Sequence, residues 1–415
     1  MTTAQARRLP PLRGVLLLPA GLALLAGLDA ALLLLGFPAP LTFSRLADVH
    51  GYLMTLGFVG TLISLERAVA LSKWWGYLSP VTMGLGGLLL LSPVPLTIAF
   101  MCSLVGITGM CVNYAVLWRR NRDEAVLIQT LGAAVAAIAT LLLISGVPIR
   151  VVVSWLAVFL ILTICGERLE LARLTLARHD GTVLLVLSCA IVLTLLGALL
   201  WPTVGYPLLG AEILGLTIWL GSRDVAMKLI RTDGLRRFMA ACMLAGYFWL
   251  GVAGAVWLLG PAFEGVRYDA VIHAVFIGFT MSMIMAHAST ILPAVLRRPL
   301  PYRSFMWVPA LLLHASLLVR LWIGDALGVL EAVEYGGLVN VIALLLFFGT
   351  AVVSSILGPP RTAPSPTKTP PAVKSPTVNL PNPETADPAV PTGATEVSPS
   401  SSPTLLALAP APKDT

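Results

Sequence analysis

Residues 14–37 read GVLLLPAGLALLAGLDAALLLLGF, a run in which Asp29 is the only charged residue. A helix of about 20 apolar residues spans the hydrocarbon core of a bilayer, so this run predicts a transmembrane helix. Its apolar and polar residues do not alternate, as they would in a strand of a membrane barrel. Of the 415 residues, 57% are hydrophobic and 11% are charged, whereas soluble domains carry roughly 25% charged residues. We therefore expect an all-α polytopic membrane protein.

Charged residues, prolines and glycines divide the sequence into twelve candidate membrane-spanning helices. Together they make a predicted twelve-helix membrane domain over residues 1–358. In residues 359–415, Pro, Ser and Thr dominate and apolar periodicity is lost, which predicts a disordered cytoplasmic tail. The predicted helices cover residues 14–36, 47–67, 77–92, 95–118, 124–146, 150–168, 182–201, 205–221, 238–260, 269–293, 304–323 and 335–357.

Basic residues alternate between the loops on the two sides of these helices. Nineteen Lys and Arg fall in loops on the side of the N-terminus, and only Arg45, Arg150 and Arg267 fall in the opposite loops. Lys and Arg are enriched in cytoplasmic loops, so we expect both termini to be cytoplasmic in the inner (cell) membrane of a bacterial-type cell. The net charge of +7 then reflects topology. The expected partner is the lipid bilayer, and no nucleic acid is expected.

Two of the five histidines lie near the starts of long apolar segments. His50 belongs to VHGYLMTLGFVGTLISLERAVAL (49–71), and His273 belongs to YDAVIHAVFIGFTMSMIMAHASTILPAVL (268–296). An ionisable side chain within a membrane segment is costly and is a functional hypothesis by default. Both helices are predicted to run inward from the outer face, which places the two imidazoles at a similar depth. Two axial ligands of one metal or haem would need this arrangement.

An internal pattern links the predicted helices 47–67, 150–168 and 269–293. The first contains Gly57-Phe58 with Glu66 nine residues after the glycine, and the last contains Gly278-Phe279 with His287 at the same distance. The middle helix ends in Glu167-Arg168, which resembles Glu66-Arg67. Four helices separate each pair of positions, so we predict three four-helix repeats around a pseudo-threefold axis.

The repeat predicts a ring of Glu66, Glu167 and His287 at the inner end of the bundle. Two carboxylates and an imidazole suit a second, transition-metal site or a proton relay. His314 lies near the predicted midplane and could share this site or bond to a neighbouring backbone group. His273 and His287 are separated by roughly 21 Å of helical rise, so they belong to different sites.

Simpler interpretations of the same charged residues remain open. Glu66-Arg67 and Glu167-Arg168 are also typical of ion pairs at helix ends, where arginine extends towards the headgroups. Arg320, near the outer end of helix 304–323, could pair with a haem propionate or with Asp325.

The sequence also resembles a known family in two of its helices. The strings are His50-Gly51-x-x-Met54-x-x-Gly57-Phe58 and His273-Ala274-x-x-x-Gly278-x-x-x-x-Met283-Ile284. They resemble the NnrS family of membrane haem proteins linked to nitric oxide and, more distantly, subunit I of haem-copper oxidases. The resemblance implies that His50 and His273 are axial ligands of a haem iron, which we expect to be b-type. Helices 150–168 and 182–201 lack the histidines of a copper–haem oxygen-reducing centre, so such a centre is not expected.

The sequence therefore favours a haem-binding integral membrane protein related to the nitric oxide response or to electron transfer. Nitric oxide would be its small-gas ligand, and its redox partner is not indicated by any motif. The alternative is a metal-ion or proton transporter, and a third hypothesis is an assembly subunit that uses its Pro-rich tail. The residues of the transporter hypothesis are Glu66, Glu167, His287 and His314.

Overall fold

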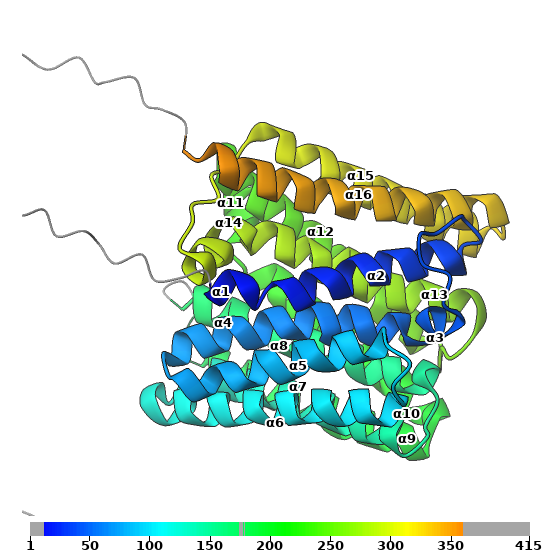
Figure 1. The fold of residues 1–415 in the computed structure, drawn as a ribbon, viewed down its shortest axis with the longest axis horizontal. Coiled ribbons are helices and arrows are strands. Elements are labelled where there is room, and N and C mark those ends of the chain that lie inside the picture. Colours follow the sequence, from blue (N-terminus) through cyan, green and yellow to red (C-terminus); the bar gives the residue numbers. More distant parts are fainter. Residues whose placement is uncertain (1–11, 174–176, 178, 360–415) are drawn as a thin grey trace, which may run out of the picture. The chain divides into compact units, whose positions relative to one another are not determined.

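The computed structural model describes residues 12–173, 177 and 179–359, and within these residues it contains helices but no strands. The predicted tail lies, apart from Pro359, outside the described residues. Most helices run side by side along one direction (Figure 1). The elements are α1 (Leu12–Val15), α2 (Leu18–Leu34), α3 (Ser44–Tyr52), η1 (Leu53–Gly60), α4 (Thr61–Leu71), η2 (Trp74–Tyr77), α5 (Leu78–Leu90), α6 (Leu96–Asn121), α7 (Glu124–Ile144), α8 (Ile149–Leu171), α9 (Asp180–Leu200), α10 (Pro202–Arg223), α11 (Ala226–Leu229), α12 (Gly234–Leu258), α13 (Gly265–His273), η3 (Ala274–Met281), α14 (Ser282–Leu296), η4 (Ser304–Met306), α15 (Trp307–Leu318), η5 (Val319–Ala326) and α16 (Leu330–Leu357).

Eleven of the predicted helix ranges overlap a helix or a continuous helical rod of the structure, and the range 14–36 covers α1 and α2, which a turn at residues 16–17 separates. Within the described residues, ten helices are long and apolar enough to cross a membrane. The helix α2, with 17 residues, and α5, with 13, are shorter. The chain is therefore a multi-pass membrane protein by helix length and composition.

Local sequence explains where several of these helices begin and end. Pro95 and Pro148 directly precede α6 and α8, because proline cannot continue a helix in the N-terminal direction without a clash. Asp123 caps α7 by accepting a hydrogen bond from the backbone N–H of Ala125 at 3.1 Å. Ser72 and Arg122 end α4 and α6 in the left-handed conformation. The break predicted between the third and fourth helices lies between the end of α5 at Leu90 and the start of α6 at Leu96.

Three rods are more buried than the other candidate spans. The most apolar window is 83% buried in Ile149–Leu171, 72% in Arg45–Leu71 and 67% in Gly265–Val295, whereas it is 50% or less buried in the others. Helix α8 packs against α3, α13 and η3, and α4 packs against α14. The three rods thus form the centre of the bundle.

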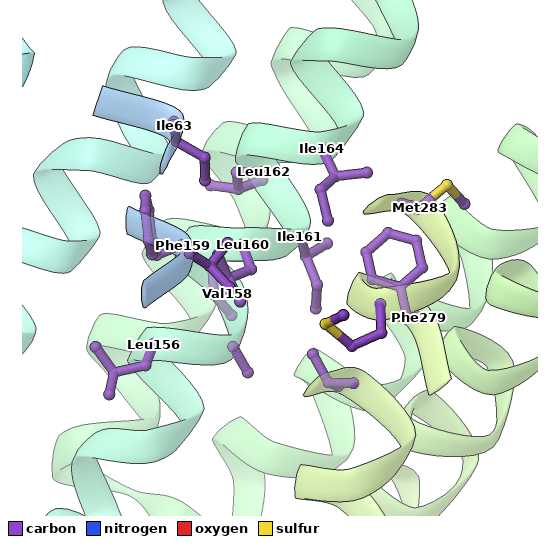
Figure 2. Packing of buried hydrophobic residues seen from close by; sticks show 14 of the residues in the cluster. Ile63, Leu156, Val158, Phe159, Leu160, Ile161, Leu162, Ile164, Phe279 and Met283 are labelled. Carbon is purple, nitrogen blue, oxygen red and sulfur yellow. The ribbon is translucent and has the colours of Figure 1, made fainter. Parts of the chain in front are cut away.

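The packing around α8 is almost entirely aliphatic and aromatic. Figure 2 shows Ile161 and Ile164 of α8 towards Phe279 and Met283, while Ile63 of α4 lies near Leu162. All six of these residues are buried members of one hydrophobic core. This core holds α4, α8 and α14 in register below the two histidines.

Candidate functional site

His50 lies near the end of α3 and is held by a backbone carbonyl of α2. Its Nδ1 donates a hydrogen bond to the carbonyl oxygen of Gly27 at 2.9 Å. A carbonyl can only accept, so Nδ1 carries the proton and Nε2 presents a lone pair. A Cβ at Gly27 would lie 2.2 Å from the sulfur of Met54. The glycine therefore allows α2 to approach the rod that carries His50.

His273 is the last residue of α13 and has the same tautomer for the same reason. Its Nδ1 donates to the carbonyl oxygen of Asp269, one turn earlier, at 2.9 Å, and lies 3.2 Å from the Oδ1 of Asp269. Within the described part of the chain, no hydrogen-bond partner is recorded for the Nε2 of His273 or of His50. His50 interacts electrostatically with both His273 and Arg320. The fold therefore places the two imidazoles within electrostatic range of each other.

Arg320 pairs with Asp269 and not with Asp325, which was one of the two partners that the sequence suggested; the other, a haem propionate, stays a prediction. Its Nε donates to the Oδ2 of Asp269 at 2.8 Å, and its Nη2 donates to Oδ1 at 2.7 Å. Asp325 interacts electrostatically with both Asp269 and Arg320, and its Oδ2 has no hydrogen-bond partner among the described residues. Asp269 thus links the arginine of η5 to the imidazole of His273, since α13 packs against η5. A carboxylate behind a histidine orients the ring and raises its basicity.

Glycines of α16 make room for the Arg320 side chain. A Cβ at Gly337 would lie 2.5 Å from the Nη1 of Arg320 and 2.7 Å from a methyl group of Leu35. A Cβ at Gly336 would lie 2.9 Å from the Cβ of Arg320. The sequence Gly336-Gly337 therefore lets α16 pass directly over the arginine.

Three π-helical segments follow or contain the residues of the outer site, which comprises His50, His273 and Arg320. Segment η1 begins three residues after His50, η3 begins directly after His273, and η5 contains Arg320. In a π-helix the hydrogen bonds run from residue i to i+5, and such segments are rare and frequently occur at functional sites. Sequence reasoning missed these segments and also missed Gly27 and Asp269. The i,i+4 spacing of Asp269 and His273 was the one available signal.

At the inner end, the structure gathers Glu66 and Glu167 around Arg67. Arg67 Nη2 donates to Glu66 at 2.6 Å, and Nη1 donates to Glu170 at 3.1 Å and to Gln129 at 3.4 Å. Glu167 interacts electrostatically with Glu66 and Arg67. Arg67 is buried, so it does not extend to the headgroups. A guanidinium group already supplies the positive charge between these carboxylates.

His287 belongs to a separate inner network. Its Nδ1 donates to the carbonyl of Met283 at 2.8 Å, and its Nε2 accepts from Arg168 Nη1 at 2.9 Å. Arg168 also donates to Asp224, through Nε at 3.0 Å and Nη2 at 2.7 Å. Arg168 thus forms its close ion pair with Asp224, and Glu167 interacts with Arg168 only electrostatically. His287 uses both ring nitrogens in this network, and neither of these hydrogen bonds involves Glu66.

His314 is bound by side chains and not by the backbone. Trp249 Nε1 donates to its Nδ1 at 3.0 Å, and its Nε2 lies 3.5 Å from the hydroxyl of Ser282. Neither of these interactions involves His287. Within the residues that the structure describes, no group of three or more His, Cys, Asp or Glu is placed to hold a metal ion.

Comparison with known proteins gives one match. Residues 13–356 match a family described as "Domain of unknown function (DUF8744)". The chain belongs to this family. No curated protein and no solved structure matches the sequence. The DUF8744 match covers α2 to α16 almost completely, so the outer histidines, Arg320 and both inner networks all lie within the family domain.

Proposed function

We propose that this DUF8744 protein binds haem in the membrane, with the Nε2 atoms of His50 and His273 as the two axial ligands of the iron. The observation that carries the proposal is the tautomer of the two imidazoles and the hydrogen bonding of their ring nitrogens. Each Nδ1 donates to a backbone carbonyl, and each Nε2 keeps its lone pair without a recorded partner in the described residues. The two rings are also within electrostatic range of each other. Neutral imidazoles oriented in this way are the usual histidine ligands of metals.

The surroundings of His273 support the same assignment. Asp269 and Arg320 hold the ring from behind, away from its free Nε2. The two ligand helices share a neighbour, because α8 packs against both α3 and α13. The donor set therefore fits a haem iron. The resemblance of both helices to the NnrS family agrees with this proposal.

Two histidine ligands would fill both axial positions of the iron. A haem held in this way supplies one-electron chemistry, with a potential tuned by hydrogen bonds to its ligands and by the apolar surroundings. Electron transfer is therefore the favoured role, and nitric oxide binding would require one histidine to leave. The five cysteines form no Cys-x-x-Cys-His motif, which favours a non-covalently held b-type haem.

We also propose that all twelve rods span the inner membrane with both termini in the cytoplasm, as the loop charges predict. Three four-helix repeats would place the second helix of each repeat at the centre. This agrees with the burial of Arg45–Leu71, Ile149–Leu171 and Gly265–Val295. It also agrees with the packing of α16 against α2, which joins the last repeat to the first.

The alternative function, transport of a metal ion or proton through the inner residues, is less well supported. Arg67 occupies the position between Glu66 and Glu170, and Arg168 donates to His287. Each arginine carries the positive charge that a bound metal ion would supply. The free imidazole nitrogens lie at the outer site.

The deciding experiment is the optical spectrum of the purified full chain after expression with added haem. The wild type should show a Soret band that shifts on reduction. His50→Ala and His273→Ala should each abolish or shift the band, because each removes one axial ligand. His179→Ala is the matched control, since His179 is exposed in a loop, and it should leave the spectrum unchanged. A wild-type protein without a Soret band, or a band that survives both alanine variants unchanged, would contradict the proposal.

A further inference from the structure

A groove of about 350 Å³ opens beside the start of α12, on the side of the molecule that carries the basic loops. The start of α15 forms its other wall. It is separate from the haem-ligand histidines and from both inner networks. Its lining residues are Asp233, Gly234, Arg237, Tyr302, Trp307 and Leu311.

The aromatic wall of the groove is firmly held. Trp307 Nε1 donates to the hydroxyl of Tyr302 at 3.1 Å. Both rings pack on the buried ring of Phe238, with centroid distances of 5.4 Å to Trp307 and 5.9 Å to Tyr302. Trp and Tyr are enriched where a membrane helix meets the headgroup region, because one end of each ring is apolar and the other polar. This wall therefore has the chemistry of the membrane–water interface.

The opposite wall carries an arginine without a recorded ion pair. Arg237 is exposed, and within the described residues it forms no ion pair with a carboxylate. Asp233 is the acidic residue of the groove, so the lining itself is close to neutral in charge. The neighbouring sequence is basic, because the exposed residues Arg236, Lys228 and Arg231 are close to Arg237 along the chain and lie outside the lining. The polar part of the groove therefore suits an anion.

The groove continues into an apolar stripe. Leu311 follows Trp307 by one turn of α15 and is 61% exposed, and Leu318 continues the same side of the helix. This helix belongs to the candidate membrane span Ser304–Ala326. A free anion would use only the polar part of this surface, whereas a molecule with a charged head and an acyl chain would use both parts.

We propose that this groove binds one anionic phospholipid of the cytoplasmic leaflet. The phosphate pairs with Arg237, the glycerol lies against the Trp307–Tyr302 wall, and an acyl chain runs along Leu311 and Leu318. Basic pockets between helix ends on the cytoplasmic side are suited to anionic headgroups, because the inner leaflet carries negative lipids. The site is independent of haem binding.

Native mass spectrometry of the full chain tests this site after reconstitution in phosphatidylcholine nanodiscs that contain a minor fraction of phosphatidylglycerol. The wild type should retain one phosphatidylglycerol in preference to phosphatidylcholine. Arg237→Gln should reduce the retained fraction about tenfold, as expected for the loss of one charge-assisted hydrogen bond. Arg231→Gln makes the same change in charge at an exposed residue outside the groove, so it should leave retention within about twofold of the wild type.

Three results would overturn the proposal. Equal losses in Arg237→Gln and Arg231→Gln would show a general electrostatic attraction and no built site. No preference of the wild type for phosphatidylglycerol would exclude an anionic-lipid site. Displacement of the lipid by millimolar inorganic phosphate would indicate a site for a free anion. Because Arg237 is exposed, its replacement should not disturb folding, which size-exclusion chromatography of the variant verifies.

Discussion

Arg320 donates two hydrogen bonds to the carboxylate of Asp269, at 2.8 Å from Nε and 2.7 Å from Nη2. The pair joins η5 to α13 and lies directly behind His273. The side chain of Arg320 is 9% exposed and that of Asp269 is 23% exposed. Both charges are therefore largely removed from solvent, so either one left alone would be costly.

Arg320→Gln should destabilise the protein by about 3 kcal/mol, towards the lower end of the cost of breaking a buried pair, because Asp269 keeps some exposure. Thermal unfolding in detergent measures the effect. Arg150→Gln is the matched control, since Arg150 pairs with Glu264 but the two side chains are 54% and 74% exposed. That control should cost less than about 1 kcal/mol. Equal losses of stability in the two variants would show that the buried Arg320–Asp269 pair stabilises the protein no more than the exposed Arg150–Glu264 pair.

Asp269→Asn should weaken haem binding and should also lower the stability of the protein, because Arg320 loses the charge of its partner. The amide keeps the shape of the carboxylate but loses the charge that acts on His273 at 3.2 Å. Loss of such a supporting group lowers metal affinity roughly 10- to 100-fold. Haem titration followed at the Soret band measures this change, with His273→Ala as the reference for complete loss. An affinity equal to that of the wild type would mean that Asp269 does not act through His273. This prediction rests on the proposed haem site.

Gly337→Ala should destabilise the protein by about 1–3 kcal/mol, because the added Cβ would lie 2.5 Å from Arg320 Nη1. Gly349→Ala on the same helix is the control, since nothing lies within 4 Å of its Cβ position. In that open position alanine should be neutral or stabilise by up to about 1 kcal/mol through helix propensity. Melting temperatures of the two variants, measured side by side, test the difference. A loss in both, or in neither, would contradict the close passage of α16 over Arg320.

His287→Ala and His314→Ala should both keep the Soret band of the haem-loaded protein. His287 accepts from Arg168, and His314 accepts from Trp249, so in each ring a nitrogen lone pair is already used. Spectra of the two variants beside His50→Ala test this. A band lost in either variant would move the haem site from the outer to the inner half of the bundle.

The helix ranges could be predicted because apolar length and loop charge are local properties of the sequence. The run 14–37 and the alternation of basic loops were enough to place a rod at every predicted position. The π-helical segments could not be predicted in this way. A change of hydrogen-bond register from i+4 to i+5 leaves little trace in the residue types of η1 or η3.

The partners of the site residues depend on which helices are neighbours, and a single sequence does not contain that information. Asp325 was one of the two expected partners of Arg320, and the packing of η5 on α13 supplied Asp269 in its place. Arg168 had its sequence neighbour Glu167 as the obvious partner. The turn after α10 brought Asp224 to it. In both cases the arginine pairs with a carboxylate that is distant in the sequence, because a guanidinium within the bundle cannot extend to solvent.

Arg168→Gln should be among the most destabilising single changes outside the apolar core. Asp224 accepts two hydrogen bonds from Arg168, one from the Tyr247 hydroxyl at 2.5 Å and one from the Ala226 backbone N–H at 2.9 Å. Its side chain is 4% exposed, so removal of the only described cation beside it leaves a buried carboxylate unpaired. The expected cost is about 3–5 kcal/mol.

Tyr247→Phe removes one hydrogen bond to the same carboxylate but leaves its ion pair intact, so it should cost only about 1.5–3 kcal/mol. Thermal unfolding of the two variants in detergent gives the order. If Tyr247→Phe were as damaging as Arg168→Gln, the network would owe its stability to hydrogen-bond geometry and not to charge compensation. The double variant Arg168→Gln with Asp224→Asn separates the two further. It should recover part of the loss, because it removes the uncompensated charge and keeps polar side chains of similar size at both positions.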